Sequence, residues 1–249
     1  MDTTQEIYLD NSATTRVSKE AAEKALYMMT ECYGNPSSLH SKGFAAEKEM
    51  TAAREIIAER LSVQPGEIYF TSGGTESDNI AILGAAHAKK RAGNKIVTTA
   101  IEHPAVLNTM AQLEKEGFEV VYVQPEADGN IPKEKFDAAI DAKTILVSVM
   151  AVNNETGVLL PLKDIAGMIK RKKAPALFHT DAVQGFCKIP LQPKKLGVDL
   201  ISVSGHKVHA PKGVGALYVK SGVRILPHSF GGGQEKNLRP GTEGVPQIC

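Results

Sequence analysis

The sequence predicts an α/β fold, in which a mostly parallel sheet is sandwiched by helices. Short apolar or β-branched runs alternate with Ala-, Glu- and Lys-rich stretches of helical spacing along most of the chain. No internal repeat or low-complexity segment interrupts this alternation, and a composition of 42% apolar and 23% charged residues is ordinary for a globular protein. Repeated strand-then-helix order favours parallel neighbouring strands with helices on both faces.

Each element follows from its local pattern. Strands are expected where short runs of apolar and β-branched residues stand together, at Glu67–Thr71, Lys95–Thr99, Glu119–Val123, Thr144–Val149, Ala176–His179, Leu200–Val203 and Gly215–Val219. Helices are expected where apolar residues recur every three or four positions, at Lys19–Thr30, Ala45–Leu61, Glu76–Arg91, Ala105–Lys115, Lys133–Ile140 and Leu162–Lys172.

Charge and hydropathy exclude several classes of function. A net charge of +1 argues against a broad electrostatic hold on nucleic acid or on an anionic membrane. No apolar run approaches the ~20 residues that span a bilayer, and the first residues are too polar for a signal peptide. His206 and His209 stand three apart without Cys, Asp or Glu at ligand spacing, so we expect no metal site. With three widely spaced cysteines, a cytoplasmic protein with reduced thiols is expected.

Polar residues follow the expected strands at the points where those strands end. They are Thr71–Thr75, Glu102–His103, Asn153–Glu155, Thr180–Gln184 and Ser204–Lys207. In an open α/β sheet, ligands bind beyond the carboxyl ends of the strands. These groups should therefore meet in one crevice.

Each of these groups has two interpretations when it is considered alone. Gly73, Gly74 and Thr75 are either a glycine turn with a Thr cap or a phosphate cup at a helix N-terminus. Lys207 is either a surface lysine or a buried amine of lowered pKa that forms a Schiff base. Asp181 is either a helix cap or the partner of a protonated pyridine nitrogen.

His103 is likewise either a loop histidine or a ring-stacking residue that moves protons. In this chain order a phosphate cup, a histidine, an aspartate and a lysine together describe a pyridoxal phosphate site. Lys207 would hold the aldehyde and Asp181 the pyridinium.

The motifs around these residues resemble those of the cysteine desulfurases, the NifS/IscS type within the pyridoxal-phosphate-dependent class V aminotransferases. The matching stretches are Ile7–Thr15, Gly34–Ser38, Phe70–Ser77, Glu102–Leu107, Val152–Gly157, His179–Gln184, Ser204–Lys207, Pro211–Tyr218 and Arg239–Glu243. They cover nearly the whole chain in order. The resemblance implies a fold-type I large domain.

The resemblance also implies roles for the matching positions. Lys207 would form the Schiff base, and Lys207 or His103 would remove the α-proton of L-cysteine. The cofactor contacts that it implies are Gly74, Thr75, Ser204 and His206 at the phosphate, Thr242 at the phosphate of the partner subunit in a homodimer, Asp181 at the ring nitrogen, Gln184 at the phenolic oxygen, His103 against the ring, and Asn154 beside cofactor and substrate.

The implied activity converts L-cysteine to L-alanine and passes the sulfur as a persulfide to an acceptor or scaffold protein, for iron–sulfur cluster assembly or thio-modification. Residues 1–16 are expected to be an N-terminal segment and residues 17–249 the cofactor-binding domain. The family's small C-terminal domain, with its nucleophilic cysteine and its carboxylate-binding arginine, would lie beyond residue 249. The chain is therefore expected to be a C-terminally truncated desulfurase with little activity of its own.

Two alternatives stay open at this point. One is a catalytically incomplete domain that binds pyridoxal phosphate and acts as a scaffold. The other is a different class V enzyme, such as a selenocysteine lyase or an aminotransferase. None of the cysteines is expected to replace the missing nucleophile: Cys32 and Cys187 stand in apolar patterns that predict burial, and Cys249 lacks an electropositive setting.

Overall fold

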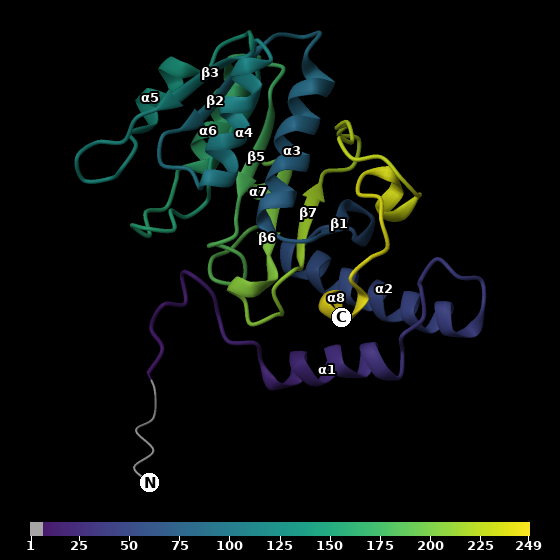
Figure 1. The fold of residues 1–249 in the computed structure, drawn as a ribbon. Coiled ribbons are helices and arrows are strands. Elements are labelled where there is room, and N and C mark those ends of the chain that lie inside the picture. Colours follow the sequence, from purple (N-terminus) through teal and green to yellow (C-terminus); the bar gives the residue numbers. More distant parts are fainter. Residues whose placement is uncertain (1–6) are drawn as a thin grey trace.

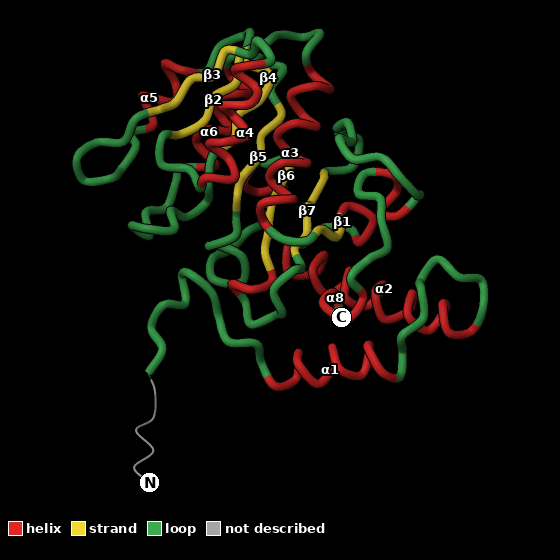
Figure 2. The backbone as a smooth tube through the Cα atoms, in the orientation of Figure 1, coloured by secondary structure: helices red, strands yellow, loops and turns green. Residues whose placement is uncertain are grey.

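A computed structural model describes residues 7–249, so that the first six residues of the expected N-terminal segment lie outside the described part. Figures 1 and 2 show one twisted sheet with helices packed around it. The strands are β1 (Ile68–Thr71), β2 (Lys95–Thr99), β3 (Glu119–Val123), β4 (Thr144–Ser148), β5 (Leu177–Asp181), β6 (Leu200–Ser204) and β7 (Gly215–Val219). Their order in the sheet is β1-β7-β6-β5-β4-β2-β3.

The sheet is mostly parallel, as predicted. Strands β3, β2, β4, β5 and β6 run parallel to one another, whereas β7 is antiparallel to both β6 and β1. The chain returns from β6 to β7 through residues 205–214, which contain only the short helix η2 (Gly205–Lys207). A parallel return would require a longer crossover, usually with a helix, so this short connection is the reason for the antiparallel strand.

Helices cover both faces of the sheet. The helices are α1 (Lys19–Thr30), α2 (Ser41–Leu61), α3 (Gly74–Lys89), α4 (Pro104–Lys115), α5 (Lys133–Ala139), α6 (Leu162–Arg171), α7 (Pro193–Leu196) and α8 (Val245–Ile248), with the 3₁₀ turns η1 (Pro65–Glu67) and η3 (Gln234–Asn237). Helices α3 and α4 form one apolar core with one face, and α1, α2, α5, α6 and α8 contribute to the core on the other. Each core follows the alternation of the strands, for example Leu146 on one face and Val147 on the other.

The six predicted helices and seven predicted strands all occur, with ends shifted by a few residues. The largest shift is at α2, which begins at Ser41 because the His40 side chain accepts a hydrogen bond from the Gly43 N–H and caps the helix. The short helices α7 and α8 were not predicted, because a single turn is too short to show a 3.6-residue period.

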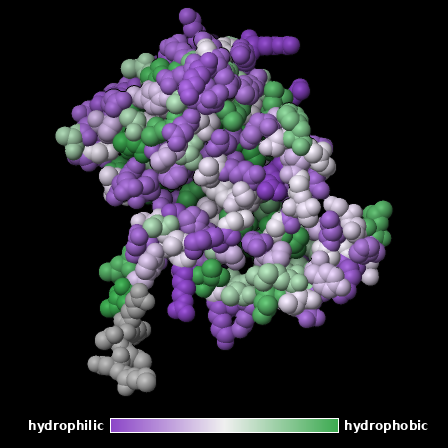
Figure 3. All heavy atoms as spheres, viewed as in Figure 1, coloured by the Kyte–Doolittle hydropathy of each residue, from purple (hydrophilic) through white to green (hydrophobic). Residues whose placement is uncertain are grey.

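Several large apolar side chains of α1 and its surroundings are exposed, among them Leu26 (57%), Met29 (54%) and Phe44 (69%). Figure 3 shows apolar atoms along the lower edge of the molecule, where α1 lies in Figure 1. No helix in the described range 7–249 is both long and apolar enough to cross a membrane.

Candidate active site

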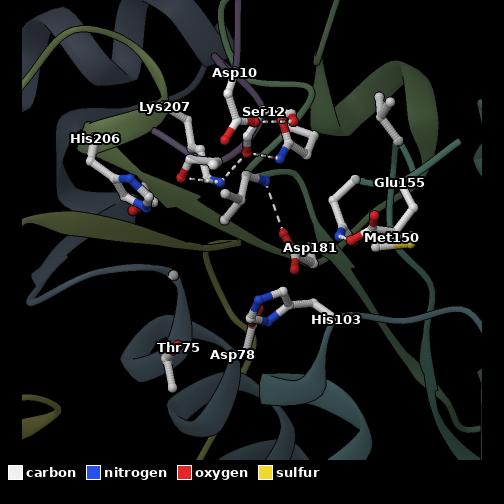
Figure 4. Close-up of a pocket in the computed structure, with 17 residues that line it drawn as sticks. Asp10, Ser12, Thr75, Asp78, His103, Met150, Glu155, Asp181, His206 and Lys207 are labelled. Carbon is white, nitrogen blue, oxygen red and sulfur yellow. Dashed lines mark hydrogen bonds between the residues drawn. The ribbon is translucent and has the colours of Figure 1, made fainter. Parts of the chain in front are cut away.

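A cavity of about 560 Å³ opens at the carboxyl ends of β1, β5 and β6, a volume suited to a small ligand. Figure 4 shows side chains from distant segments pointing into it. Nine of the ten predicted site residues border this cavity: Gly74, Thr75, His103, Asn154, Asp181, Gln184, Ser204, His206 and Lys207. The tenth, Thr242, does not border it and is exposed in the loop that follows η3.

The glycine turn before α3 forms an open cup. Gly73 has φ +152°, a conformation in which side chains are rarely accommodated. A Cβ on Gly74 would lie 2.7 Å from Val183 Cγ2, so only glycine leaves the space above this turn free. The first N–H groups of α3 have no partners within the helix and carry its positive end, which is a setting for an anion.

The structure excludes Thr75 as the helix cap, which was part of one of the two interpretations of this turn. Gly73 is the N-cap residue of α3, and Thr75 lies inside the first turn with an exposed side chain. Its hydroxyl is therefore free to face the cup.

The Lys207 amine lies in the cavity and is held by the N-terminal segment. Its Nζ donates hydrogen bonds to the carbonyl oxygens of Ser12 and Ala13, the latter at 2.9 Å. Burial lowers the pKa of Lys207, and Lys188 lowers it further, while Asp10 and Asp181 oppose the shift. A lysine with a lowered pKa has a larger fraction of neutral, nucleophilic amine at neutral pH.

Asp181 lies at the floor of the cavity and is only 6% exposed. Its Oδ1 accepts a hydrogen bond from the Val183 N–H at 2.9 Å. Burial raises the pKa of Asp181, whereas that hydrogen bond and the nearby His103 and Lys207 favour the carboxylate. A buried carboxylate whose surroundings favour its ionised form is suited to pair with a positively charged ring nitrogen.

His103 caps helix α4, because its Nδ1 accepts a hydrogen bond from the Ala105 N–H at 3.1 Å. In the neutral ring this bond leaves the proton on Nε2. The preceding Glu102 is 4% exposed and accepts hydrogen bonds from the Thr99 hydroxyl and the Met150 N–H. Glu102 thereby joins the ends of β2 and β4 beneath His103, and burial raises its pKa to about 8.

The other predicted residues complete the rim. His206 Nδ1 lies 3.1 Å from Thr14 Oγ1, and burial together with Lys207 and Lys212 lowers the pKa of His206. Gln184 Nε2 donates to the Ser12 carbonyl oxygen at 2.9 Å.

Asn154, also on the rim, donates from Nδ2 to Glu155 Oε1 at 2.7 Å. Thr242 belongs to a loop that is tied to the start of α3 by Arg239, whose Nε lies 3.2 Å from Glu76 Oε1.

Sequence reasoning missed several residues of the cavity. The N-terminal residues Asp10, Ser12 and Ala13 line it, although they follow no strand. Asp78 also lines it from the second turn of α3, three residues after Thr75. The spacing of three was a usable signal, because residues three apart share a face of a helix.

The cysteines differ from the predictions at one position. Cys32 is buried, as predicted, but Cys187 is exposed. The chain turns at Cys187 with φ +59°, which directs this side chain to the solvent after the buried Phe186. Cys249 packs against the core on the α1–α2 side, and burial raises the pKa of its thiol to about 11. Within residues 7–249 there is no cluster of His, Cys, Asp and Glu that could hold a metal ion.

The family named aminotransferase class-V matches residues 7–245 of the chain. Cysteine desulfurase IscS of Methanosarcina thermophila is 48% identical over 242 residues, which cover 97% of this chain and 59% of that protein. A cysteine desulfurase of Trichormus azollae is 47% identical over 244 residues, which cover 97% of this chain and 60% of that protein. The chain thus spans about three fifths of the length of these curated relatives.

Solved structures of similar proteins also superpose on this chain. A NifS-like protein superposes with a TM-score of 0.95 at 45% identity, covering 98% of this chain and 67% of the other. The structure titled "SspA in complex with cysteine" superposes with a TM-score of 0.92 at 40% identity, covering 98% of this chain and 70% of the other.

Proposed function

This chain belongs to the aminotransferase class-V family, and from that premise we propose that it is a desulfurase-type enzyme that uses pyridoxal phosphate to take sulfur from L-cysteine. The observation that carries the proposal is the cavity that Gly74, Asp181 and Lys207 share. Its relatives are named cysteine desulfurases, and one solved relative is described in complex with cysteine. Residues 17–249 would form the cofactor-binding domain.

The side chains in the cavity fit this cofactor in charge and in shape. The glycine cup would receive the phosphate, since a Cβ at Gly74 would fill that space. Ser204, His206 and the Thr75 hydroxyl border the same cavity and would add donors. Asp181 would face the ring nitrogen, and Gln184 the phenolic oxygen. When bound, the cofactor supplies an aldehyde and a ring that accepts electrons.

Lys207 would serve as the amine and as the base at the substrate α-carbon. Its lowered pKa leaves more of the amine neutral, and the carbonyl oxygens of Ser12 and Ala13 accept its N–H groups whenever it is free of the cofactor. His103 would instead donate a proton, because its Nδ1 is engaged by the Ala105 N–H and its proton therefore stands on Nε2. The two residues thus divide the proton transfers between them.

A homodimer belongs to the proposal. Thr242 is exposed and does not border the cavity of its own chain, and its loop is anchored to α3 by the Arg239–Glu76 pair. In the dimer, Thr242 would reach the phosphate cup of the partner subunit.

A cysteine thiolate other than Cys32, Cys187 and Cys249 would attack the substrate sulfur, so that an S–S bond forms as the C–S bond of the substrate breaks. The resulting persulfide would pass the sulfur to an acceptor protein.

Binding of pyridoxal phosphate to the purified chain tests the cofactor assignment. We expect a visible absorbance band and equilibrium binding, and Lys207→Ala should remove the band. Lys194→Ala, at an exposed position of α7, is the matched control and should retain it. A protein that stays colourless and releases all cofactor on dialysis would refute the assignment.

A second measurement tests the substrate. L-Cysteine should change the visible spectrum of the loaded protein at concentrations at least about tenfold lower than L-serine or L-aspartate. An equal response to the three amino acids would refute L-cysteine as the substrate while leaving the cofactor assignment intact.

A further inference from the structure

A row of polar side chains crosses the buried face of the sheet beneath α3. Ser148 of β4, His179 of β5 and Ser202 of β6 are each 0% exposed. Ser148 Oγ lies 2.8 Å from His179 Nδ1, and His179 Nε2 lies 2.9 Å from Ser202 Oγ. Two positions earlier in each of these strands the residue is a buried leucine. The face therefore changes from apolar to polar where the strands approach the cavity.

Asp78 of α3 meets this row from above. It is 1% exposed and borders the same cavity as Asp181, and Figure 4 shows both near His103. Its Oδ1 lies 3.6 Å from His179 Nε2, and Ser202, whose Oγ lies 2.9 Å from the same nitrogen, favours the ionised form of Asp78. Oδ1 has no hydrogen-bond partner in the described part of the chain. An ionised carboxylate with an unpaired oxygen is costly in such a place, whereas a protonated one is much less so.

The surroundings of the two aspartates differ in the donors and charges that they offer. Asp181 accepts a hydrogen bond from the Val183 N–H, and His103 and Lys207 favour its ionised form. For Asp78 only the Ser202 hydroxyl favours ionisation, whereas burial and the carboxyl groups of Asp181 and Glu102 act against it.

His179 is the basic group closest to Asp78, and burial lowers its pKa to about 3, so that it supplies no compensating charge. Burial and the two carboxyl groups raise the pKa of Asp78 well above its usual range.

We propose that Asp78 is a neutral carboxylic acid that joins the Ser148–His179–Ser202 row to α3 and so leaves Asp181 as the single negative charge at the cavity floor. Asp78 is thus a positioning residue, because it acts on the cofactor through Asp181. This role rests on the proposed function of the cavity as a pyridoxal phosphate site. A second carboxylate beside Asp181 would raise the cost of ionising Asp181, since like charges disfavour one another.

Two measurements test the proton on Asp78 without the cofactor. Because the pKa of Glu102 is also raised, to about 8, the infrared spectrum at neutral pH should contain C=O bands of more than one buried protonated acid. Asp78→Asn should remove one band that Glu102→Gln retains, and Glu102→Gln should remove another that Asp78→Asn retains. As the pH rises above the usual titration range of an aspartate, the melting temperature of Asp78→Asn should rise relative to that of the unchanged chain. The reason is that native Asp78 keeps a proton that the unfolded chain has lost. An unchanged infrared spectrum or a constant difference in melting temperature would overturn the proposal.

Equilibrium binding of pyridoxal phosphate tests the positioning role. Asp78→Asn, which is also neutral and of similar shape, should bind within about threefold of the unchanged chain, whereas Asp78→Leu should bind about tenfold or more weakly. A tenfold loss of binding in Asp78→Asn would show that a negative charge on Asp78 is needed. Unchanged binding by Asp78→Leu would show that the polar contact of Asp78 with the Ser148–His179–Ser202 row is not needed. Either result overturns the proposal. If Asp78→Leu does not fold, Asp78→Asn and the infrared spectrum still decide. Failure of the unchanged chain to bind pyridoxal phosphate would overturn the proposed function instead.

Discussion

Replacement of Gly215 by alanine tests whether the glycine cup holds the phosphate. Gly215 begins β7, and its φ lies outside the left-handed region, so alanine strains no backbone angle there. The added Cβ would lie 2.7 Å from both Gly73 Cα and Gly73 C, and 2.7 Å from the Val203 carbonyl oxygen. Carbon atoms pack at about 3.5–4.0 Å, so the backbone at Gly73 must move by about 1 Å.

This displacement sets the size of the expected effect. The N–H groups at the start of α3 move with Gly73, and a hydrogen bond to a charged group contributes about 1.5–3 kcal/mol. Loss of one such bond to the phosphate weakens pyridoxal phosphate binding about tenfold to a hundredfold, since about 1.4 kcal/mol corresponds to a factor of ten. Overpacking also lowers the free energy of unfolding by about 1–3 kcal/mol.

The assay is an equilibrium titration with pyridoxal phosphate, followed by visible absorbance and accompanied by denaturant unfolding. Gly167→Ala is the control, because its Cβ would meet no atom within 4 Å and its place inside α6 favours alanine by about 0.5–1 kcal/mol. The control should bind as the unchanged chain does. Binding by Gly215→Ala within about twofold of the unchanged chain would refute the assignment of the cup to the phosphate.

Three other predictions concern stability and reactivity. Glu235→Ala removes the two hydrogen bonds from Arg54 at 2.7 and 2.9 Å. Because Arg54 is partly exposed, the free energy of unfolding in denaturant titrations should fall by about 2–4 kcal/mol. A loss below about 1 kcal/mol would contradict this expectation. The pKa of Glu102 is raised from 4.5 to about 8, so its protonation stabilises the fold at low pH, and this contribution is lost as the pH rises from 4.5 to about 8. Glu102→Gln should flatten that part of the curve of unfolding free energy against pH. An unaltered slope would contradict the raised pKa. Cys187 should react with a thiol reagent before Cys32 in the folded protein, as measured by peptide mass spectrometry, and equal labelling would argue against the exposed turn.

Much of the cavity could be predicted from the sequence because its residues follow strands. Gly74 and Lys207 come after β1 and β6, Asp181 is the last residue of β5, and these three strands end at the same edge of the sheet. A pattern that identifies the strands therefore also identifies which loops meet. The central strand β4 was equally clear, because Ile145, Leu146 and Val147 form the short apolar run that is typical of a strand buried on both faces.

Other features depend on contacts that leave no local pattern. Cys187 is exposed because the chain turns there with a positive φ, although its neighbours suggest burial. The loop carrying Thr242 is anchored at Glu76 rather than directed into the cavity of its own chain. A short return connection made β7 antiparallel, while the strand pattern of β7 itself is compatible with either direction.

The sequence by itself determined the succession of strands and helices and the set of polar loops at the strand ends, because both follow from periodicities of two and 3.6 residues along the chain. Only the tertiary structure decided that Ser12 and Ala13 accept the hydrogen bonds of Lys207. It also decided that Asp78 is buried between α3 and a polar row of the sheet. Desolvation and hydrogen bonding are properties of the space around a group, and that space is formed by segments far apart in the sequence.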